Sequence, residues 1–300
     1  MSVDIVMATY NGARFVKEQI ASIQNQSFTD WRLLISDDNS NDDTITIIKE
    51  MMQGDERIQL INIKRQGGVI RNFSNALSEA ETDYILLADQ DDIWQDDRLE
   101  KLVEKIKKLD SANDNLPKMI FTDLTLVDED NNVIADSFYR SNKINPTDNL
   151  TNYNLLWRST VYGCTCILNK KLLNIALPIP EYAHMHDQWL ALMAKKYDGL
   201  YFYDFSSIRY RQHSTNAVGG KNKNLFQKFS AIQKNIMNID CLVDRTIVMI
   251  KNNQSLFKDN VMQNKKDYVK FALQEVLPWV FKGNKKIFSL FVLIRLLIKR

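Results

Sequence analysis

Three acidic side chains fall within four consecutive positions in Asp89-Gln90-Asp91-Asp92, directly after the apolar run Tyr84–Ala88. Carboxylates at this spacing repel one another, and a divalent cation removes the repulsion. Their hard oxygens select Mg²⁺ or Mn²⁺, which proteins commonly hold through one or two carboxylates and substrate phosphates. A solvated surface turn is the alternative, but the preceding run has the composition of a central strand. The sequence therefore predicts a metal and phosphate site after this strand.

Two earlier loops carry side chains suited to a nucleotide. Thr9, Tyr10 and Asn11 follow the first apolar run, and Asp37 with Asp38 follows the second. The Tyr10 ring can stack on a base and the Thr9 hydroxyl can hydrogen-bond to it, while a carboxylate at a strand end can accept a ribose hydroxyl or a base N–H. The chain has neither a G-x-G-x-x-G after the first strand nor a G-x-x-x-x-G-K-[ST] motif. These absences argue against a Rossmann cofactor and exclude a P-loop.

A fourth group lies far along the chain, in His184-Met-His186-Asp187 and in Tyr210-Arg211-Gln-His213. Taken alone, Asp187 is explained as a helix cap and His186 as a buried core group. A donor that carries phosphate needs more, because the attacking hydroxyl requires a base and the leaving group requires a cation. The acidic clusters therefore raise this group to a candidate for catalysis.

These loops need a scaffold that brings strand ends together. Short apolar runs alternate with segments of helical period through the first ninety residues, which is typical of βαβ units and a parallel sheet. Ligands of such sheets lie beyond the carboxyl ends of the strands, so we expect the loops after Ala8, Ser36 and Ala88 to converge. The predicted strands are Val3–Ala8, Trp31–Ser36, Ile58–Ile63 and Tyr84–Ala88, and the predicted helices are Arg14–Gln26, Asp43–Met52 and Ile70–Ala80.

The rest of the first 220 residues also mixes the two kinds of element. We expect helices at Arg98–Leu109 and Asp187–Lys196, a hairpin of Met119–Val127 with Val133–Phe138, a strand at Gly163–Leu168, and edge strands at Gly199–Tyr203 and Ser206–Gln212. From Leu225 onward the pattern is helical and basic. The predicted domains are residues 1–220, an α/β domain, and residues 221–300, a helical C-terminal region.

Composition and charge narrow the class of protein. The chain has 300 residues, 45% of them hydrophobic and 25% charged, which is typical of a globular protein. Three cysteines are too few for a disulfide framework, and no charged-then-apolar leader precedes the first strand, so we expect a cytoplasmic protein. Residues 1–220 hold 23 basic and 32 acidic side chains, and residues 221–300 hold 16 and 5. An acidic body with a basic tail argues against a nucleic-acid partner.

The last segment, Lys285–Arg300, is apolar over Ile287–Ile298 apart from Arg295, with basic residues at both ends. It is shorter than the roughly 20 residues that span a bilayer. The pattern predicts either an interfacial helix, peripheral on the inner face of the cell membrane, or a terminal helix that packs on the domain or forms a homodimer.

The motifs together resemble a known family. Their order and wording, in particular Asp-Gln-Asp-Asp-Ile-Trp, Met-His-Asp-Gln-Trp-Leu and Tyr-Arg-Gln-His, are similar to family 2 inverting glycosyltransferases of the GT-A fold. The branch resembled is the rhamnosyltransferase-like one, which builds bacterial surface polysaccharides. The resemblance covers roughly residues 2–220. It implies a nucleotide-sugar-binding fold, Rossmann-like, with a mixed and mainly parallel sheet between helices.

The resemblance also implies roles by position. Asp38 would bind the uracil or thymine ring, and Asp187 would be the catalytic base. Asp91 would be the more direct ligand of Mg²⁺ or Mn²⁺, with Asp89 and His213 beside it. The remaining donor-binding positions are Thr9, Tyr10, Asn11, Gly67, Arg71, Gln90 and Arg211.

The function implied is transfer of a sugar, first of all L-rhamnose from dTDP-rhamnose, to a saccharide or lipid-linked acceptor. A UDP-hexose donor and a non-catalytic sugar-nucleotide-binding protein are the alternatives. A sugar-1-phosphate nucleotidyltransferase is disfavoured, because Ala8–Arg14 lacks the Gly and Lys of a triphosphate-binding loop.

Overall fold

The computed structural model describes residues 2–112, 116–151, 153–213, 240–253, 265–281 and 286–298. It divides into two compact units. The first unit contains residues 1–138, 161–180 and 185–213, and the second contains 139–160, 181–184 and 214–300. The sequence placed a boundary at residue 220, whereas the second unit also takes in two segments from the middle of the chain.

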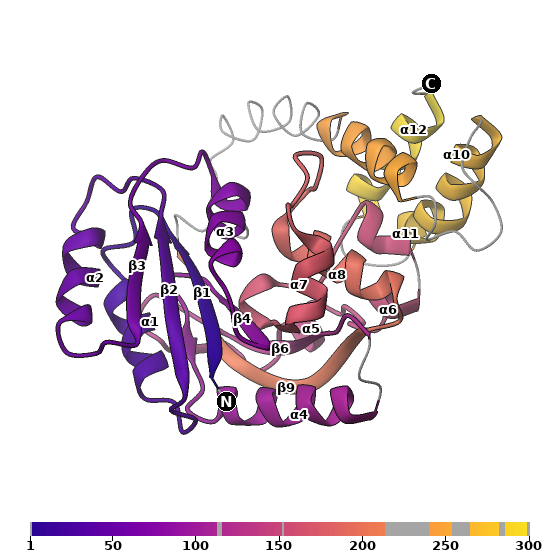
Figure 1. Cartoon of the computed structure of the whole chain (residues 1–300). Coiled ribbons are helices and arrows are strands. Elements are labelled where there is room, and N and C mark those ends of the chain that lie inside the picture. Colours follow the sequence, from indigo (N-terminus) through magenta and orange to yellow (C-terminus); the bar gives the residue numbers. More distant parts are fainter. Residues whose placement is uncertain are drawn as a thin grey trace. The chain divides into compact units, whose positions relative to one another are not determined.

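The first unit is built on a nine-stranded mixed sheet, counted over the described residues, in the order β3-β2-β1-β4-β8-β6-β9-β5, with β7 beside β6 (Figure 1). The strands are β1 Val3–Thr9, β2 Trp31–Asp37, β3 Ile58–Asn62, β4 Tyr84–Ala88, β5 Ile93–Trp94, β6 Met119–Val127, β7 Val133–Ala135, β8 Ile167–Asn169 and β9 Leu200–Arg211. β1 pairs in parallel with β2 and β4, and β2 with β3. The long ladder of β6 and β9 is parallel too, while β8 runs antiparallel between β4 and β6. The predicted α/β fold with a mixed, mainly parallel sheet is confirmed.

Helices cover both faces of this sheet. They are α1 Val16–Gln24, α2 Thr44–Met52, α3 Val69–Ser78, α4 Arg98–Ala112, α7 Lys170–Ala176 and α8 His186–Lys196. Side chains of α1, α2 and α4 join one hydrophobic core with Val3, Ile5 and Met7 of β1. α3 packs on β1 and β2 from the other face and contacts α8. β1 is therefore buried on both sides, which explains why its sequence is apolar without alternation.

The structure corrects three sequence-based elements. Gly163–Thr165 is a 3₁₀ turn and only Ile167–Asn169 is a strand, because the amides of Thr165 and Cys166 bond back to Tyr162 and Gly163. The two predicted edge strands are one interior strand, β9, which lies between β6 and β5. A register shift opposite Thr122 and Asp123 lets β9 continue through its polar middle. The second hairpin strand ends at Ala135, and residues from Phe138 form the short helix α5 (Phe138–Ser141).

The second unit is helical where it is described. Besides residues 240–252 it contains α6 Asp148–Thr151, the 3₁₀ helix Tyr153–Leu156, α10 Lys265–Phe271, a π-helical turn Ala272–Val276, α11 Leu277–Phe281 and α12 Lys286–Ile298. The predicted helical stretch from Leu225 lies outside the described residues as far as residue 239. Among the helices that the structure describes, none is long and apolar enough to cross a bilayer.

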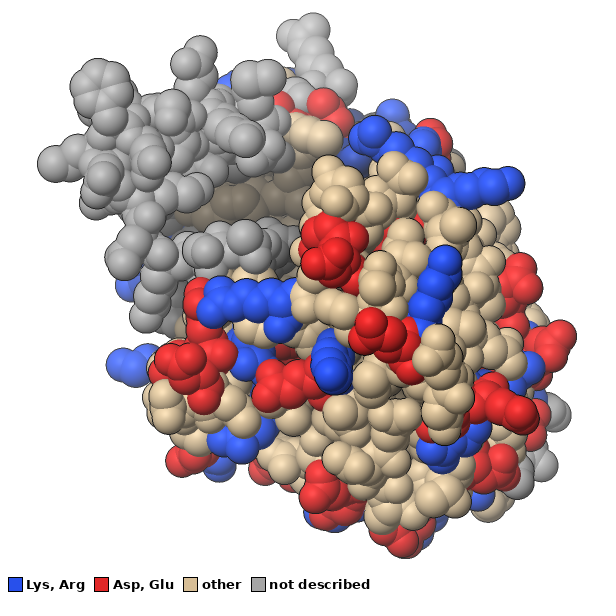
Figure 2. All heavy atoms as spheres, turned by 90° about the vertical axis from the view of Figure 1, so that its left-hand side faces the viewer, with Lys and Arg blue, Asp and Glu red and all other residues tan. Residues whose placement is uncertain are grey.

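Charge on the first unit is mixed at the surface. Acidic and basic side chains are interspersed on the face shown in Figure 2. Neighbouring charges of opposite sign contribute little to stability when they are solvated. This face therefore looks like an ordinary solvated surface.

Asp4 of β1 is a carboxylate buried within the sheet. Asp4 of β1 accepts two hydrogen bonds from Arg32 of β2, at 2.8 and 3.0 Å, and backbone N–H groups of Glu81 and Thr82 donate to it at 2.7 and 3.0 Å. Burial raises the pKa of Asp4, but the Arg32 and backbone hydrogen bonds outweigh burial and leave the pKa below its ordinary value. This group joins the first two strands to the turn before β4.

We expect Asp4→Asn to lower the free energy of unfolding by about 2–4 kcal/mol, because Arg32 loses its buried partner. A lowered folded-state pKa means that the unfolded chain binds more protons, so this contribution is complete above about pH 4 and is lost as the pH falls further. Urea unfolding at pH 7 and pH 3.5 measures both effects. Equal stability of the variant and the parent at pH 7 would contradict the assignment.

Candidate active site

The loops after β1, β2 and β4 meet at one edge of the sheet, as the sequence predicted. The hydroxyl of Thr9 donates to Asp37 at 2.7 Å, which joins the first two strand ends. The amide of Gln90 pairs with the backbone of Tyr10 in both directions, at 2.9 and 3.1 Å, which joins the first and fourth. Asn11 stands in the left-handed region with φ 47° and donates its backbone N–H to Ser40. Side chains therefore lock this edge in place.

The position of Gln90 explains a glycine in the first loop. A Cβ on Gly12 would lie 2.2 Å from the Gln90 side-chain oxygen. Gln90 was predicted to bind the donor, and in the structure its amide holds the backbone of the Tyr10 loop. The ring of Tyr10 remains 55% exposed, whereas Thr9 is buried.

Asp38 lies against the loop that contains Gly67 and Gly68. Its carboxylate accepts backbone N–H groups of Gln66, of Gly67 at 2.9 Å and of Gly68 at 2.8 Å. Both glycines have positive φ, 91° and 116°, a conformation that side-chain-bearing residues rarely adopt. Burial raises the Asp38 pKa, but the three N–H groups outweigh it and the pKa is lowered. Arg71 lies close by, 3.6 Å from a Cβ placed on Gly67.

Carboxylates of the loop after β4 lie close to the carboxylate of Asp187 in α8. Burial, together with the nearby charges of Asp91 and Asp187, raises the pKa of Asp89 to about 7. Like charges act in this way only at close range. The structure thus brings the predicted metal carboxylates near the predicted base, although α8 lies far from β4 in the sequence.

Asp187 stands in the first turn of α8. Its two carboxylate oxygens accept the backbone N–H of Gly163 at 2.9 Å and of Gln188 at 2.6 Å. The helix N-terminus favours a negative charge there. A Cβ on Gly163 would lie 3.4 Å from that of Asp187 and 2.9 Å from a ring nitrogen of His186, so the glycine allows this close approach. The neighbouring His186 ring stacks on Phe73 at 3.9 Å, and burial lowers its pKa, which fits a neutral core group.

Asp91 and His213 form a second contact at the site. The Nε2 atom of His213 lies 3.0 Å from a carboxylate oxygen of Asp91. The His213 ring also packs on Phe15, with the ring centroids 4.8 Å apart. The end of β9 is therefore brought to the loop after β4, whereas the ligand atoms of Asp89 lie close to those of Asp92 and Cys164.

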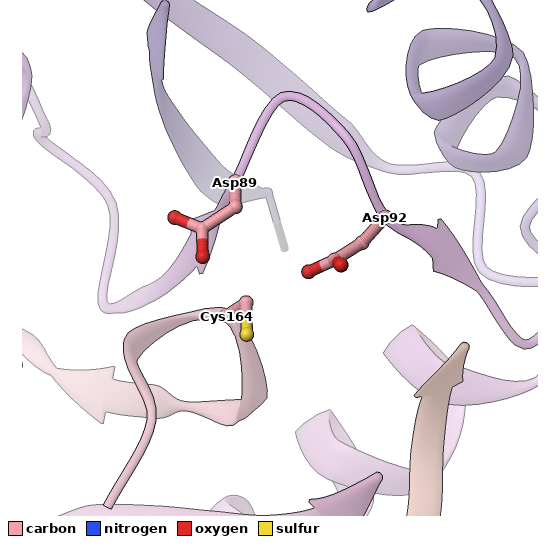
Figure 3. Close-up of side chains that lie close together, drawn as sticks. All are labelled: Asp89, Asp92 and Cys164. Carbon is pink, nitrogen blue, oxygen red and sulfur yellow. The ribbon is translucent and has the colours of Figure 1, made fainter. Parts of the chain in front are cut away.

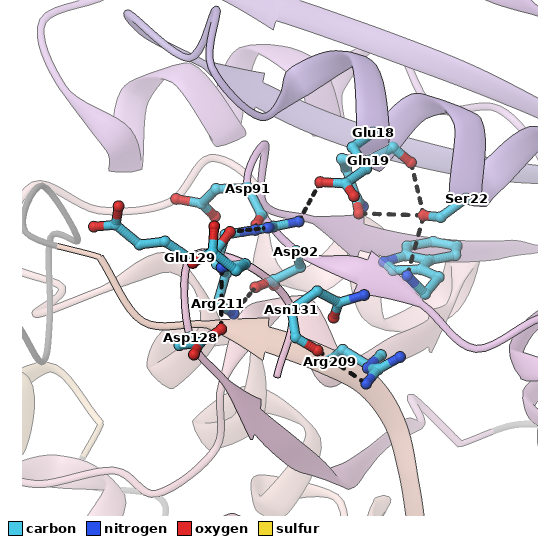
Figure 4. A network of polar contacts seen from close by, with 12 residues as sticks. Glu18, Gln19, Ser22, Asp91, Asp92, Asp128, Glu129, Asn131, Arg209 and Arg211 are labelled. Carbon is cyan, nitrogen blue, oxygen red and sulfur yellow. Dashed lines mark hydrogen bonds and ion pairs between the residues drawn. The ribbon is translucent and has the colours of Figure 1, made fainter. Parts of the chain in front are cut away.

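Arg211 is buried beneath this pair, in a polar network (Figure 4). Its guanidinium donates to the backbone oxygens of Asp91 at 3.1 Å and Glu129 at 2.7 Å, and it forms an ion pair with Glu18. The sequence predicted a donor contact for Arg211, whereas the structure shows it joining β9, α1 and two loops. Glu18 was missed, because one acidic residue on a helix gives no signal in the sequence.

A second group of possible metal ligands lies near Asp91. Single ligand atoms of Asp89, Asp92 and Cys164 are all within 4.8 Å of one another, and the two carboxylates flank the thiol at the ends of one loop (Figure 3). Asp92 is only 1% exposed, and one of its oxygens accepts no hydrogen bond from a nitrogen or oxygen donor in the described part of the chain. A buried carboxylate oxygen without a partner fits a cation. The residues present therefore suit a divalent metal ion.

Arg98 supplies a buried positive charge next to these groups. It donates to the hydroxyl of Ser207 at 2.5 Å and the carbonyl of Cys164 at 2.7 Å, and it lies over the Trp94 ring at 4.3 Å. Burial lowers the pKa of Arg98 to about 10, which leaves it charged at neutral pH. Neither Arg98 nor Cys164 was predicted, because their proximity depends on the tertiary fold.

Comparison of the sequence with known proteins finds enzymes named as sugar transferases. The chain is 28% identical over 233 residues to the dTDP-rhamnosyl transferase RfbG of Shigella flexneri, covering 71% of this chain and 73% of the relative. It is 25% identical over 265 residues to the UDP-Glc:alpha-D-GlcNAc-diphosphoundecaprenol beta-1,3-glucosyltransferase WfgD of Escherichia coli, covering 86% and 97%. Both relatives act on sugars, with different donors in their names.

Solved structures share the fold at low identity. TarS 1-349 of S. aureus, crystallised with UDP-GlcNAc, has a TM-score of 0.60 at 14% identity, covering 99% of this chain and 82% of that one. The mannosyltransferase PcManGT from Pyrobaculum calidifontis, in complex with GDP-Man and Mn²⁺, has a TM-score of 0.54 at 14% identity, covering 99% and 86%. The predicted GT-A fold is confirmed.

The sequence model described as Glycosyl transferase family 2 matches residues 4–173, which include β1 to β4 and the acidic loop that follows. This is more than half of the chain. The chain therefore belongs to glycosyl transferase family 2.

Proposed function

We propose that the chain transfers a sugar from a nucleoside-diphosphate donor to an acceptor hydroxyl, with inversion at the anomeric carbon. The observation that carries the proposal is the position of Asp187 beside the acidic loop after β4. Asp187 accepts the backbone N–H of Gly163, and the thiol of the next residue, Cys164, lies within 4.8 Å of ligand atoms of Asp89 and Asp92. A leaving diphosphate needs positive charge and an attacking hydroxyl needs a base. This edge offers cation ligands and a separate carboxylate.

The nucleotide would bind along the loops after β1 and β2. Asp38 would accept the N–H of a uracil or thymine ring, in exchange for backbone N–H groups of the loop at Gly67 and Gly68 that it now holds. The exposed ring of Tyr10 would stack on the base, and Arg71 lies close to the same loop. Thr9 and Asn11 would act through the loop that their hydrogen bonds hold in place.

Mg²⁺ or Mn²⁺ would be held by Asp91, Asp89 and His213, with Asp92 and Cys164 next to them. When bound, the ion neutralises the charge that develops on the departing diphosphate. Arg98 and Arg211 keep the surrounding loop and strand end in position.

Asp187 would accept the proton of the acceptor hydroxyl as that oxygen forms its bond to the anomeric carbon. The bond from this carbon to the diphosphate oxygen breaks on the opposite face, so one displacement inverts the configuration. The backbone N–H groups of Gly163 and Gln188 hold the carboxylate in a fixed orientation, and such positioning lowers the barrier.

For the substrates, we propose L-rhamnose from dTDP-rhamnose first, and a UDP-hexose as the alternative. Relatives named for each kind of donor support both. A saccharide or lipid-linked glycan of a cell-surface polysaccharide is the proposed acceptor, supported by the diphosphoundecaprenol acceptor in the name of WfgD. Thermal-shift screening of nucleotide sugars with Mn²⁺ would identify the donor.

Asp187→Asn is expected to fold and bind donor normally while transfer falls about 10²–10⁴-fold, because the base is lost. The measurement is release of the nucleoside diphosphate with acceptor present, together with UDP or dTDP binding by calorimetry. Asp96→Asn, at an exposed acidic residue, is the control. Near-normal turnover of Asp187→Asn would rule out this base, and a parent chain that binds donor without turnover would favour the non-catalytic alternative.

Asp91→Ala is expected to abolish the Mn²⁺-dependent part of nucleotide binding, because the ion loses a carboxylate and the His213 contact loses its partner. Calorimetric titration with UDP or dTDP, with and without Mn²⁺, measures this part of the binding. Asp97→Ala is the control, since the Asp97 side chain pairs with Lys101 at the surface. An unchanged Mn²⁺ effect in Asp91→Ala would contradict the metal assignment.

Arg211→Lys separates positioning from donor contact. A lysine cannot reach all three partners of the buried guanidinium, so we expect the free energy of unfolding to fall by about 2–4 kcal/mol. Urea unfolding measures this, alongside the KM for donor. Unchanged stability with a raised KM would instead support direct contact of Arg211 with the donor.

A further inference from the structure

Helix α12 presents two opposed apolar faces. Val292, Leu293 and Leu296 are buried. At about 100° per residue, the exposed apolar residues fall within one arc of about 100° on the opposite side of the helix. We call these residues the α12 strip, and they are Leu290, Phe291, Ile294 and Ile298, exposed by 41%, 40%, 40% and 63%.

The buried face of α12 packs within its own unit. α12 contacts α10, α11 and the π-helical turn before α11, and Arg295 forms an ion pair with Asp240 at 2.9 Å. The helix is therefore fixed in its unit by one side alone. The α12 strip is left over, and Phe281 at the end of α11 is exposed by 71% in the same unit. Soluble surfaces rarely gather large apolar side chains in this way.

The charge of the C-terminal region indicates what covers the α12 strip. Residues 221–300 carry 16 basic and 5 acidic side chains. Lys265 and Lys270 of α10 and Lys286 at the start of α12 are exposed. Two copies of so basic a region repel each other, whereas anionic lipid head groups attract it. The charge favours a lipid surface over a second copy of this chain.

We propose that the α12 strip docks the protein on an anionic lipid surface. A helix of 13 residues is about 20 Å long, too short to cross a bilayer. It would lie in the plane of the interface, with the strip among the upper acyl chains and the basic side chains at the head groups. The surface belongs to the second unit and uses no residue of the sugar-transfer site.

The test is flotation of the full chain with vesicles of phosphatidylcholine alone or with phosphatidylglycerol. We expect binding to the anionic vesicles that weakens as salt rises, and at least about tenfold weaker binding to the neutral ones. The double variant Phe291→Glu/Ile294→Glu should lower binding to anionic vesicles by about tenfold or more, because two charges replace apolar groups that would enter the lipid.

A matched control adds the same charges elsewhere. Val133 and Ile134 of β7 are exposed by 51% and 55%, so Val133→Glu/Ile134→Glu should bind vesicles like the parent. Both variants should keep the parent's unfolding temperature and its transfer to a soluble acceptor, which separates this test from that of the proposed function.

Three results would overturn the proposal. One is equal binding of the parent to neutral and anionic vesicles, and another is unchanged binding of Phe291→Glu/Ile294→Glu. The third is a parent dimer, seen by light scattering, that this variant converts to monomer without loss of vesicle binding, because the strip would then cover a second copy.

Discussion

Mutual repulsion of carboxylates at one edge of the sheet is the constraint on which the site depends. Burial raises the pKa of Asp89, and the nearby charges of Asp91 and Asp187 raise it as well. The chain tolerates this arrangement because N–H groups hold Asp187 and buried guanidinium groups stand nearby. The negative charge that remains uncompensated gives the site an affinity for a cation and for the phosphates that the cation binds. The same electrostatic strain that would destabilise an empty surface turn thus suits the site of a family 2 glycosyltransferase.

The scaffold around that edge is held by polar contacts between loops. Side chains at the ends of β1, β2 and β4 bond to the backbone of the neighbouring loop, as Gln90 does to Tyr10. Arg211 extends the same principle to β9 and α1. Contacts of this kind place reacting groups before a substrate arrives, and such positioning is a large part of catalysis when two substrates must align.

The first 220 residues and the last 80 differ in charge. The first unit has acidic clusters after β2 and β4 and mixed charge on the face in Figure 2. The basic C-terminal region contains α12, which exposes the apolar α12 strip. The free energy gained by apolar burial decreases with the buried area, and electrostatic attraction to a surface decreases as salt rises. The two units can therefore be tested separately, by different variants and under different conditions.

The sequence by itself determined the α/β class, the strands β1 to β4 and the helices between them. It also determined the loops that carry Asp38 and Asp91 and the helix that begins near Asp187. Those features depend on hydrophobic period and element order, which are local along the chain. Only the tertiary structure decided that Arg211 is buried, that β9 is one interior strand, and that Cys164 and Arg98 lie under the acidic loop. It also decided which face of α12 is free. Each of these depends on contacts between residues far apart in sequence, and packing of distant elements leaves no periodic signal in the chain.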